Sequence, residues 1–245
     1  MSIHTANNQR AGAFPTTHWN LVTQATEGQA EEANLALEEI CNVYWHPIFT
    51  YLGAKGFSKQ DAEDLTQGYF SSVLRRQSLH HVDSARGKLR TFFLSDLKRF
   101  IADERRHNAA QKRGGRAHFE ALDDCIEKEA LVVERIDPET LYMKAWAITL
   151  IERATASLRK NYIESGKENV FDLIADYLYG KNEGIPYPDI AVSLKTSISA
   201  ARLTVFRLRQ RFRSILESEI AHTVESSNQV GEEIDFLFQA VAAKR

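Results

Sequence analysis

The sequence has 245 residues, of which 43% are hydrophobic and 26% are charged, and its formal net charge is −2. This composition is typical of a soluble globular protein, and no stretch approaches the roughly 18 apolar residues that a membrane-spanning helix needs. The opening sequence "MSIHTANNQRAGAF" lacks the apolar core of a secretion signal, and Cys41 and Cys125 have no metal-ligand spacing. We therefore expect a cytoplasmic protein with reduced cysteines and no membrane partner.

The pattern of apolar residues predicts an all-α fold. Most segments repeat apolar residues every three or four positions, and no period-two run of β-branched residues is bounded by turn signals. The first expected element is a short helix capped by Thr16 or Thr17. A longer helix over 31–51 follows, and Pro47 is a position where it can bend.

Two further helices are expected before the composition changes. One begins at Ser58, which has the spacing of a capping box with Asp61, and the other covers 88–107. The basic sequence "RRHNAAQKRGGR" (105–116) then predicts a mobile arm. The acidic stretch 119–137 is either a solvated linker or a segment that folds back on basic surfaces of the same chain.

Helical signals resume after the acidic stretch. Asp137 is a predicted N-cap, with Pro138 at the first helical position, and Gly180 ends the helical sequence "ENVFDLIADYLYG". The amphipathic piece "EEIDFLFQAVAAKR" closes the chain. We predict two helical domains joined by a charged linker: a first domain over 1–107, a linker over 108–137, a helix-turn-helix domain over 138–222 and a tail over 223–245.

The stretch "KTSISAARLTVFRLRQRFR" (195–213) holds five arginines and no acid. It follows "YPDIAVSL" after a break of about three residues, which is the pattern of a helix-turn-helix. At 100° per residue its buried face holds Ala201, Val205, Leu208, Phe212 and Ile215. The alternative is an amphipathic surface helix solvated by arginine. Binding to duplex DNA is the favoured interpretation, through Ser199, Arg202, Leu203, Phe206, Arg207, Arg209 and Arg213.

A second candidate nucleic-acid surface lies on the helix over 88–107. Phe93, Leu94, Leu97 and Ile101 share its buried side, and an aromatic residue is interleaved with cations on the opposite side. Rings stack on unpaired bases and cations hold phosphates, so this face is suited to a single strand. Burial of Phe92 against a neighbouring helix is the alternative. The candidate residues are Phe92, Ser95, Lys98, Arg99 and Arg106.

Three motifs together resemble the extracytoplasmic-function (ECF) class of bacterial RNA polymerase sigma factors, and they occur in that family's order. "DAEDLTQGYFSSVL" (61–74) resembles the helix that docks on core polymerase. "LRTFFLSDLKRFIADERR" (89–106) resembles the segment that melts and reads the minus-10 element. "YPDIAVSLKTSISAARLTVFRLRQRFR" (187–213) resembles the helix-turn-helix for the minus-35 element. The opening "FPTTHWNLV" resembles a subgroup with an extended C-terminal domain.

The resemblance implies a sigma factor that binds core RNA polymerase and directs initiation at particular promoters. It implies promoter DNA as the second partner, an anti-sigma protein as a candidate third, and no catalytic site, metal or cofactor. The residues implied to dock on the polymerase are Asp61, Asp64, Gln67 and Phe70.

The sequence departs from the family pattern at four places. Gly68 stands where Glu is usual, Arg99 replaces a usual Asn, and Lys195 replaces the Gly of the turn, where a side chain is expected to cause strain. Residues 141–186 are also longer than the usual run before the helix-turn-helix.

Two other kinds of function were weighed. A helix-turn-helix regulator that acts without polymerase explains 187–213 but not the predicted docking helix. An enzyme would have to use the cluster of His80, His81 and Asp83, because the acid pairs at 38–39 and 123–124 are typical of a solvated surface.

Overall fold

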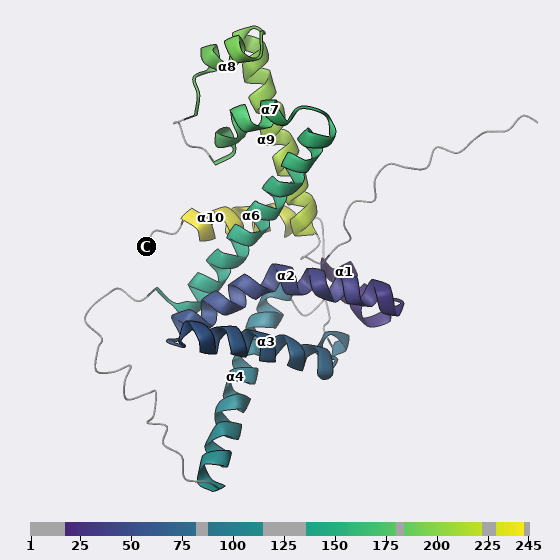
Figure 1. Cartoon of the computed structure of the whole chain (residues 1–245), viewed down its shortest axis with the longest axis vertical. Helices are drawn as coiled ribbons and strands as arrows, with labels where there is room; N and C mark the ends of the chain where they lie inside the picture. The colour runs from purple at the N-terminus through teal and green to yellow at the C-terminus, as the bar shows by residue number, and fades with distance from the viewer. Residues whose placement is uncertain (1–17, 82–87, 115–135, 180–183, 222–228, 243–245) are drawn as a thin grey trace, which may run out of the picture.

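The computed structural model describes residues 18–81, 88–114, 136–179, 184–221 and 229–242, and these ranges contain helices and turns but no strand. The predicted all-α fold is therefore confirmed for the part of the chain that is described. The molecule is elongated, with a small helical hairpin at one end and a long projecting helix at the other (Figure 1).

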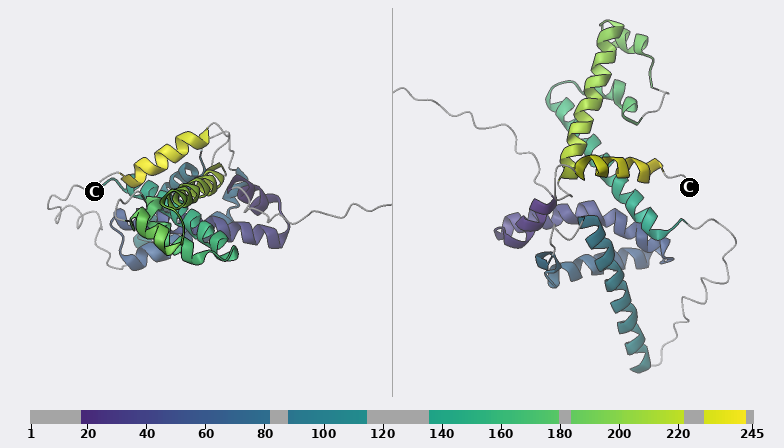
Figure 2. Two further views of the ribbon diagram at one scale, coloured as in Figure 1. Left: turned by 90° about the horizontal axis from the view of Figure 1, so that it is seen from above. Right: turned by 180° about the vertical axis from the view of Figure 1, so that it is seen from behind.

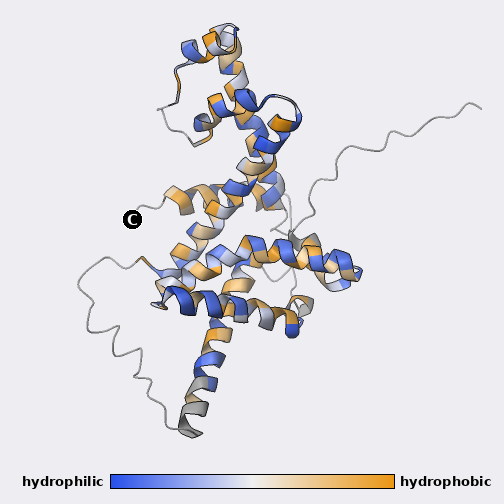
Figure 3. Cartoon of the chain, viewed as in Figure 1, coloured by the Kyte–Doolittle hydropathy of each residue, from blue (hydrophilic) through white to orange (hydrophobic). Residues whose placement is uncertain are grey.

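The N-terminal elements form a helical bundle around buried aromatic rings. Tyr44 and Phe93 stack with their ring centroids 4.2 Å apart, and the Tyr69 hydroxyl donates a hydrogen bond to the Phe93 carbonyl at 3.2 Å. The elements are α1 (His18–Glu27), α2 (Ala30–Ala54), α3 (Lys59–Arg75), the 3₁₀ turn η1 (Ser78–His81) and α4 (Leu89–Gly114). Figure 3 shows hydrophobic and hydrophilic residues alternating along α2 and α3, as expected for helices that bury one side.

Two predicted helix starts are confirmed. The Ser58 hydroxyl accepts a hydrogen bond from the Asp61 backbone N–H at 3.1 Å and donates one to the Asp61 carboxylate at 2.6 Å. The Asp137 carboxylate accepts from the backbone N–H of Thr140 at 3.1 Å, and Pro138 occupies the first helical position. Pro47 is buried inside α2, which continues through it, and the predicted caps at 16 and 17 lie outside the described residues.

The expected end of the fourth helix and the start of the mobile arm were wrong. α4 does not stop near 107 but continues to Gly114, so residues 105–114 are helical. The reason is that Arg, Ala, Gln and Lys are good helix formers, and the glycine pair acts only at the end of this run. Residues 115–135 of the predicted linker lie outside the described ranges.

α6 (Pro138–Glu164) runs from the N-terminal bundle toward the helical hairpin at the other end of the molecule (Figure 2). Near its N-terminus, Tyr142 is fully buried and its hydroxyl donates to the Arg90 carbonyl on α4 at 3.0 Å. Toward its C-terminus, Ala154 and Leu158 are buried in the part of the helix that packs on α9 (Ile198–Ala221). One core thus runs along α6, and the division into two domains stays a prediction.

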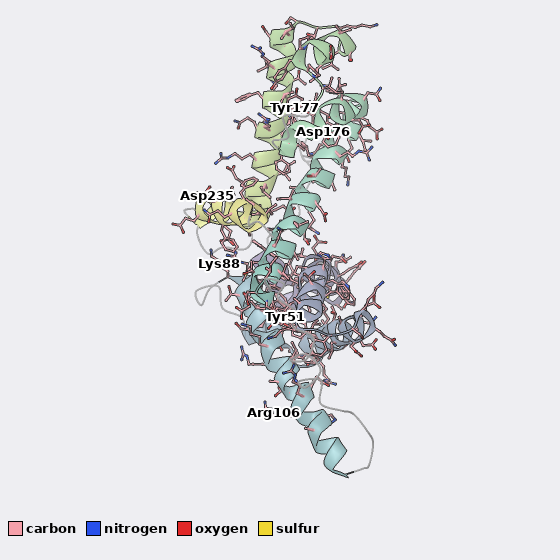
Figure 4. All side chains as sticks on the ribbon, turned by 90° about the vertical axis from the view of Figure 1, so that its left-hand side faces the viewer. Tyr51, Lys88, Arg106, Asp176, Tyr177 and Asp235 are labelled. Carbon is pink, nitrogen blue, oxygen red and sulfur yellow. The ribbon has the colours of Figure 1, made fainter. Side chains whose placement is uncertain are left out.

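The C-terminal helix α10 (Gln229–Ala242) is held by a buried ion pair. Glu233 is 0% exposed and its carboxylate contacts the Arg90 guanidinium and the Lys88 ammonium at the start of α4. The Arg90 guanidinium also lies over the rings of Trp146, at 4.6 Å, and Phe236, at 4.4 Å. Burial lowers the pKa of Arg90 to about 10, so the guanidinium remains charged at neutral pH. In Figure 4, Lys88 lies beside this helix, which is marked by Asp235.

Candidate nucleic-acid interface

A helix-turn-helix lies at the end of the molecule opposite to α4. α8 (Tyr187–Ser193) ends in a Schellman motif, in which the Thr196 N–H donates to Ala191 and the Lys195 N–H donates to Val192. This motif requires a left-handed residue, and Lys195 has a φ of 51°, so the strain expected at this position is present. Ser197 then caps α9, since its hydroxyl accepts from the Ala200 N–H at 3.2 Å.

The predicted faces of α9 are confirmed except at Ile215. Ala201, Val205, Leu208 and Phe212 are buried, while Ile215 is half-buried. Every residue proposed to contact duplex DNA is exposed: Ser199, Arg202, Leu203, Phe206, Arg207, Arg209 and Arg213. The helix therefore presents its cations and three large apolar side chains, those of Ile198, Leu203 and Phe206, to solvent.

Tyrosine rings position three of the five arginines. The guanidinium of Arg202 lies 5.6 Å from the centroid of the Tyr187 ring, and that of Arg211 lies 5.6 Å from Tyr162. Arg209 lies 5.9 Å from the Tyr177 ring and its Nε donates to the Tyr177 carbonyl at 2.9 Å. A cation–π contact orients a guanidinium without neutralising it. At these three positions the positive charge of α9 is thus both ordered and retained.

The other two arginines differ in their surroundings. Arg213 forms an ion pair with Glu217, whose carboxylate accepts from its Nε at 2.8 Å and raises the pKa of Arg213. Arg207 is exposed and forms no ion pair with any described residue. The three tyrosines were missed by sequence reasoning, because they come from α6, η3 (Ala175–Tyr179) and α8, and no local pattern links them to α9.

The second predicted surface is present on α4, with one difference. Ser95, Lys98, Arg99 and Arg106 are exposed, but Phe92 is half-buried and packs edge to face on Phe93 at 5.5 Å. Two of the cations already have carboxylate partners. Lys98 pairs with Glu139 of α6, which raises the pKa of Lys98, and Arg106 pairs with Asp103.

A basic groove of about 780 Å³ lies beside this face, between α4, the end of α2 and the start of α6. Lys98 and Arg106 line it, as do Lys55 and Arg105, which the sequence prediction omitted. Arg105 could have been found from its spacing, since it lies seven residues, or about two turns, after Lys98. Lys55 follows α2, and nothing in its local sequence indicates the groove. Figure 4 shows Arg106 and Tyr177 toward opposite ends of the molecule.

The predicted docking helix α3 exposes Asp61, Asp64 and Gln67, but not Phe70. Phe70 is only 6% exposed and stacks on Trp45 at 5.9 Å, so its ring belongs to the core and is unavailable for docking in this conformation. It packs inward because it lies four residues after Thr66 and three before Val73, both of which are buried on the same side of α3.

An open groove of about 560 Å³ lies between α3 and α4. Its apolar lining includes Leu65, Phe100 and Ile101, and Gly68 leaves space above the Phe100 ring. Charged residues of both signs surround this lining: Asp61, Asp64, Arg75, Glu104 and Arg105. The groove thus combines an apolar floor with a charged rim.

The described residues contain no group of three His, Cys, Asp or Glu side chains that could hold a metal ion. Asp83 and the side chains of His80 and His81 lie outside what the structure describes, so the alternative cluster stays a hypothesis. Within the described ranges, no helix is long and apolar enough to span a membrane.

Comparison with known proteins gave no match: no protein-family model fits the sequence, and no curated protein or solved structure is significantly similar to it.

Proposed function

We propose that this chain is a sigma factor of the extracytoplasmic-function class, which acts in the cytoplasm as a dissociable subunit of RNA polymerase. The observation that carries the proposal is the helix-turn-helix of α8 and α9. Three of its five guanidinium groups are held in place by Tyr187, Tyr177 and Tyr162 with their charge retained. Such an arrangement favours a polyanion, because ordered cations release counterions from DNA phosphates on binding.

The N-terminal half of α9 would enter the major groove of the minus-35 element. There Ser199, Arg202, Leu203 and Phe206 face outward, while the remaining arginines clamp phosphates. Binding to duplex DNA should therefore weaken steeply as salt is raised.

The exposed face of α4 and the adjoining basic groove would hold the melted minus-10 strand. Arg99, Arg105 and Lys55 supply cations for phosphates, and the exposed part of the Phe92 ring offers a surface for a base. Lys98 could contact a phosphate as well only after its ion pair with Glu139 is broken. Strand opening would then draw on base capture and on contacts with the polymerase.

Core polymerase would dock on α3 through Asp61, Asp64 and Gln67, with the apolar groove beside Gly68 as part of the surface. The test is affinity for purified core polymerase. Replacing Asp61 and Asp64 together by Asn should weaken binding about three- to tenfold, as expected for two exposed charges. The matched control is Glu152→Gln, on the exposed side of α6, which should leave the affinity unchanged.

A chain that binds duplex DNA tightly and never associates with core polymerase would contradict the proposal. That outcome would favour a helix-turn-helix regulator that acts alone.

A further inference from the structure

The exposed face of α9 has an apolar stripe between two rows of cations. Leu203 is 45% exposed and Phe206 is 57% exposed, and they lie about one turn apart on the side opposite the buried face. Arg202, Arg209 and Arg213 lie on one side of this stripe, and Arg207 and Arg211 lie on the other. Large apolar side chains in the middle of a charged helix face require an explanation.

Duplex DNA matches this arrangement of charge and apolar surface. The major groove has phosphates along both rims, and the one apolar group on its base edges is the 5-methyl group of thymine. Leu203 and Phe206 are separated by only about 4.5 Å along the helix axis, so both can reach base pairs that are neighbours. A protein partner would instead need an apolar groove with acidic residues along both sides.

We propose that Leu203 and Phe206 are specificity residues that contact thymine methyl groups and so select thymine at two neighbouring positions of the duplex element. The inference rests on the proposed function, because it assigns base preferences to the same helix. Arg207, Arg209, Arg211 and Arg213 would hold the helix in register while contributing little to the choice of base.

Replacing thymine by deoxyuracil tests this inference, because it removes the methyl group and leaves the hydrogen-bonding groups unchanged. Sites would first be selected from a duplex library with a randomised segment, using the full-length protein with core polymerase. Each thymine of the selected site would then be replaced singly. We expect a three- to fourfold loss of affinity at two neighbouring positions and little change elsewhere.

Variants assign each position to a side chain. Leu203→Ala should abolish the effect of deoxyuracil at one position, and Phe206→Ala should abolish it at the other. Arg207→Ala is the phosphate-binding control. It should weaken binding to all sequences, lower the slope of log affinity against log salt by about 1, and keep both deoxyuracil effects. Val192→Ala, at a side chain that is 78% exposed on α8, should change nothing.

The outcomes separate this inference from the proposed function. Tight duplex binding with no deoxyuracil effect overturns the inference alone. Absence of duplex binding, with and without polymerase, overturns both. If Leu203→Ala and Phe206→Ala fold and bind DNA normally but lose affinity for polymerase, the apolar stripe is a protein-binding surface and the inference is wrong.

Discussion

Lys195 and Gly166 occupy the same position in two copies of one motif. After α6, the Gly166 N–H donates to Ile163 and the Lys167 N–H donates to Tyr162, which repeats the pattern that ends α8. The φ angles are 66° at Gly166 and 51° at Lys195. A side chain in this left-handed region costs roughly 1–2 kcal/mol, which glycine avoids.

We therefore expect Lys195→Gly to raise the free energy of unfolding by about 0.5–1 kcal/mol, after allowing for the larger unfolded-state entropy of glycine. Urea unfolding followed by circular dichroism measures this. Lys195→Ala keeps the strain and should have almost no effect, while Gly166→Ala should destabilise by about 1 kcal/mol. A loss of stability in Lys195→Gly would mean that the Lys195 side chain makes a stabilising contact.

Gly68 is a second residue whose replacement should stabilise the fold. It lies in the middle of α3, and an added Cβ would lie 3.6 Å from Cζ of Phe100, an ordinary van der Waals distance. Because glycine is about 1 kcal/mol less favourable than alanine inside a helix, Gly68→Ala should stabilise by about that amount. Thermal unfolding would test it, and a lower melting temperature would show that Phe100 cannot tolerate the contact.

At the scale of elements, the pair of Glu233 with Arg90 fixes α10 on the rest of the molecule. Glu233→Gln keeps the shape of the side chain but leaves a buried guanidinium without its carboxylate. Breaking a buried pair in this way costs about 3–5 kcal/mol. We expect a loss of that size in urea unfolding, and faster cleavage within α10 by a protease.

Two further variants test the cause of that loss. Glu232 is exposed on the same helix, so Glu232→Gln should leave stability nearly unchanged. Replacing Glu233 and Arg90 together by Met should recover much of the loss, because no uncompensated charge remains buried. Equal losses in the single and double variants would contradict the ion-pair explanation.

A second junction joins α2, α6 and α9 and should make stability depend on pH. Arg153 pairs with Glu39 and Glu219, and burial raises the pKa of Glu219 above its ordinary value of 4.5 despite the opposing effect of Arg153. The folded state thus holds this proton more tightly than the unfolded state does. The contribution of Glu219 to stability is therefore greatest below pH 4.5 and falls as the pH rises toward its folded pKa.

Comparison with Glu219→Gln isolates this effect. The two proteins should have similar stability in acid, and the variant should become relatively more stable as the pH approaches neutrality. Urea midpoints measured across this range would test the sign. A variant that loses stability relative to the original protein as the pH rises would mean that attraction to Arg153 outweighs burial.

Helix faces and helix starts were predictable because their signals are local. The capping residues Ser58 and Asp137 and the buried stripe of α9 follow from spacing within a single turn or helix. The extension of α4 to Gly114 was missed because its basic composition is equally typical of a loop. The burial of Glu233 was also unpredictable, since its partners Lys88 and Arg90 are 145 and 143 residues away in the sequence.

In the candidate site too, the features with local sequence signals were predictable and those that depend on tertiary packing were not. Exposure of the α9 arginines follows from helical periodicity, but their support by Tyr187, Tyr177 and Tyr162 depends on how three other segments pack. Phe70 was misplaced because the prediction relied on the resemblance of a motif, whereas its ring packs against Trp45 from another helix.

At the scale of the whole molecule, two basic surfaces lie far apart on one elongated scaffold (Figure 1). α9 carries one surface and α4 carries the other, and α6 and α10 join the elements between them. A protein that reads a promoter at two separated elements needs such a separation, with the polymerase docked between or beside them. The orientation of the two surfaces in the free protein is set by packing along α6.

Transcription by purified core polymerase on fragmented genomic DNA, with and without this protein, tests the central claim most directly. We expect the protein to create a defined set of transcript starts that share two sequence elements upstream, and Arg202→Ala to reduce their output strongly. If the pure, folded protein is added and the transcripts are the same as without it, the claim is contradicted.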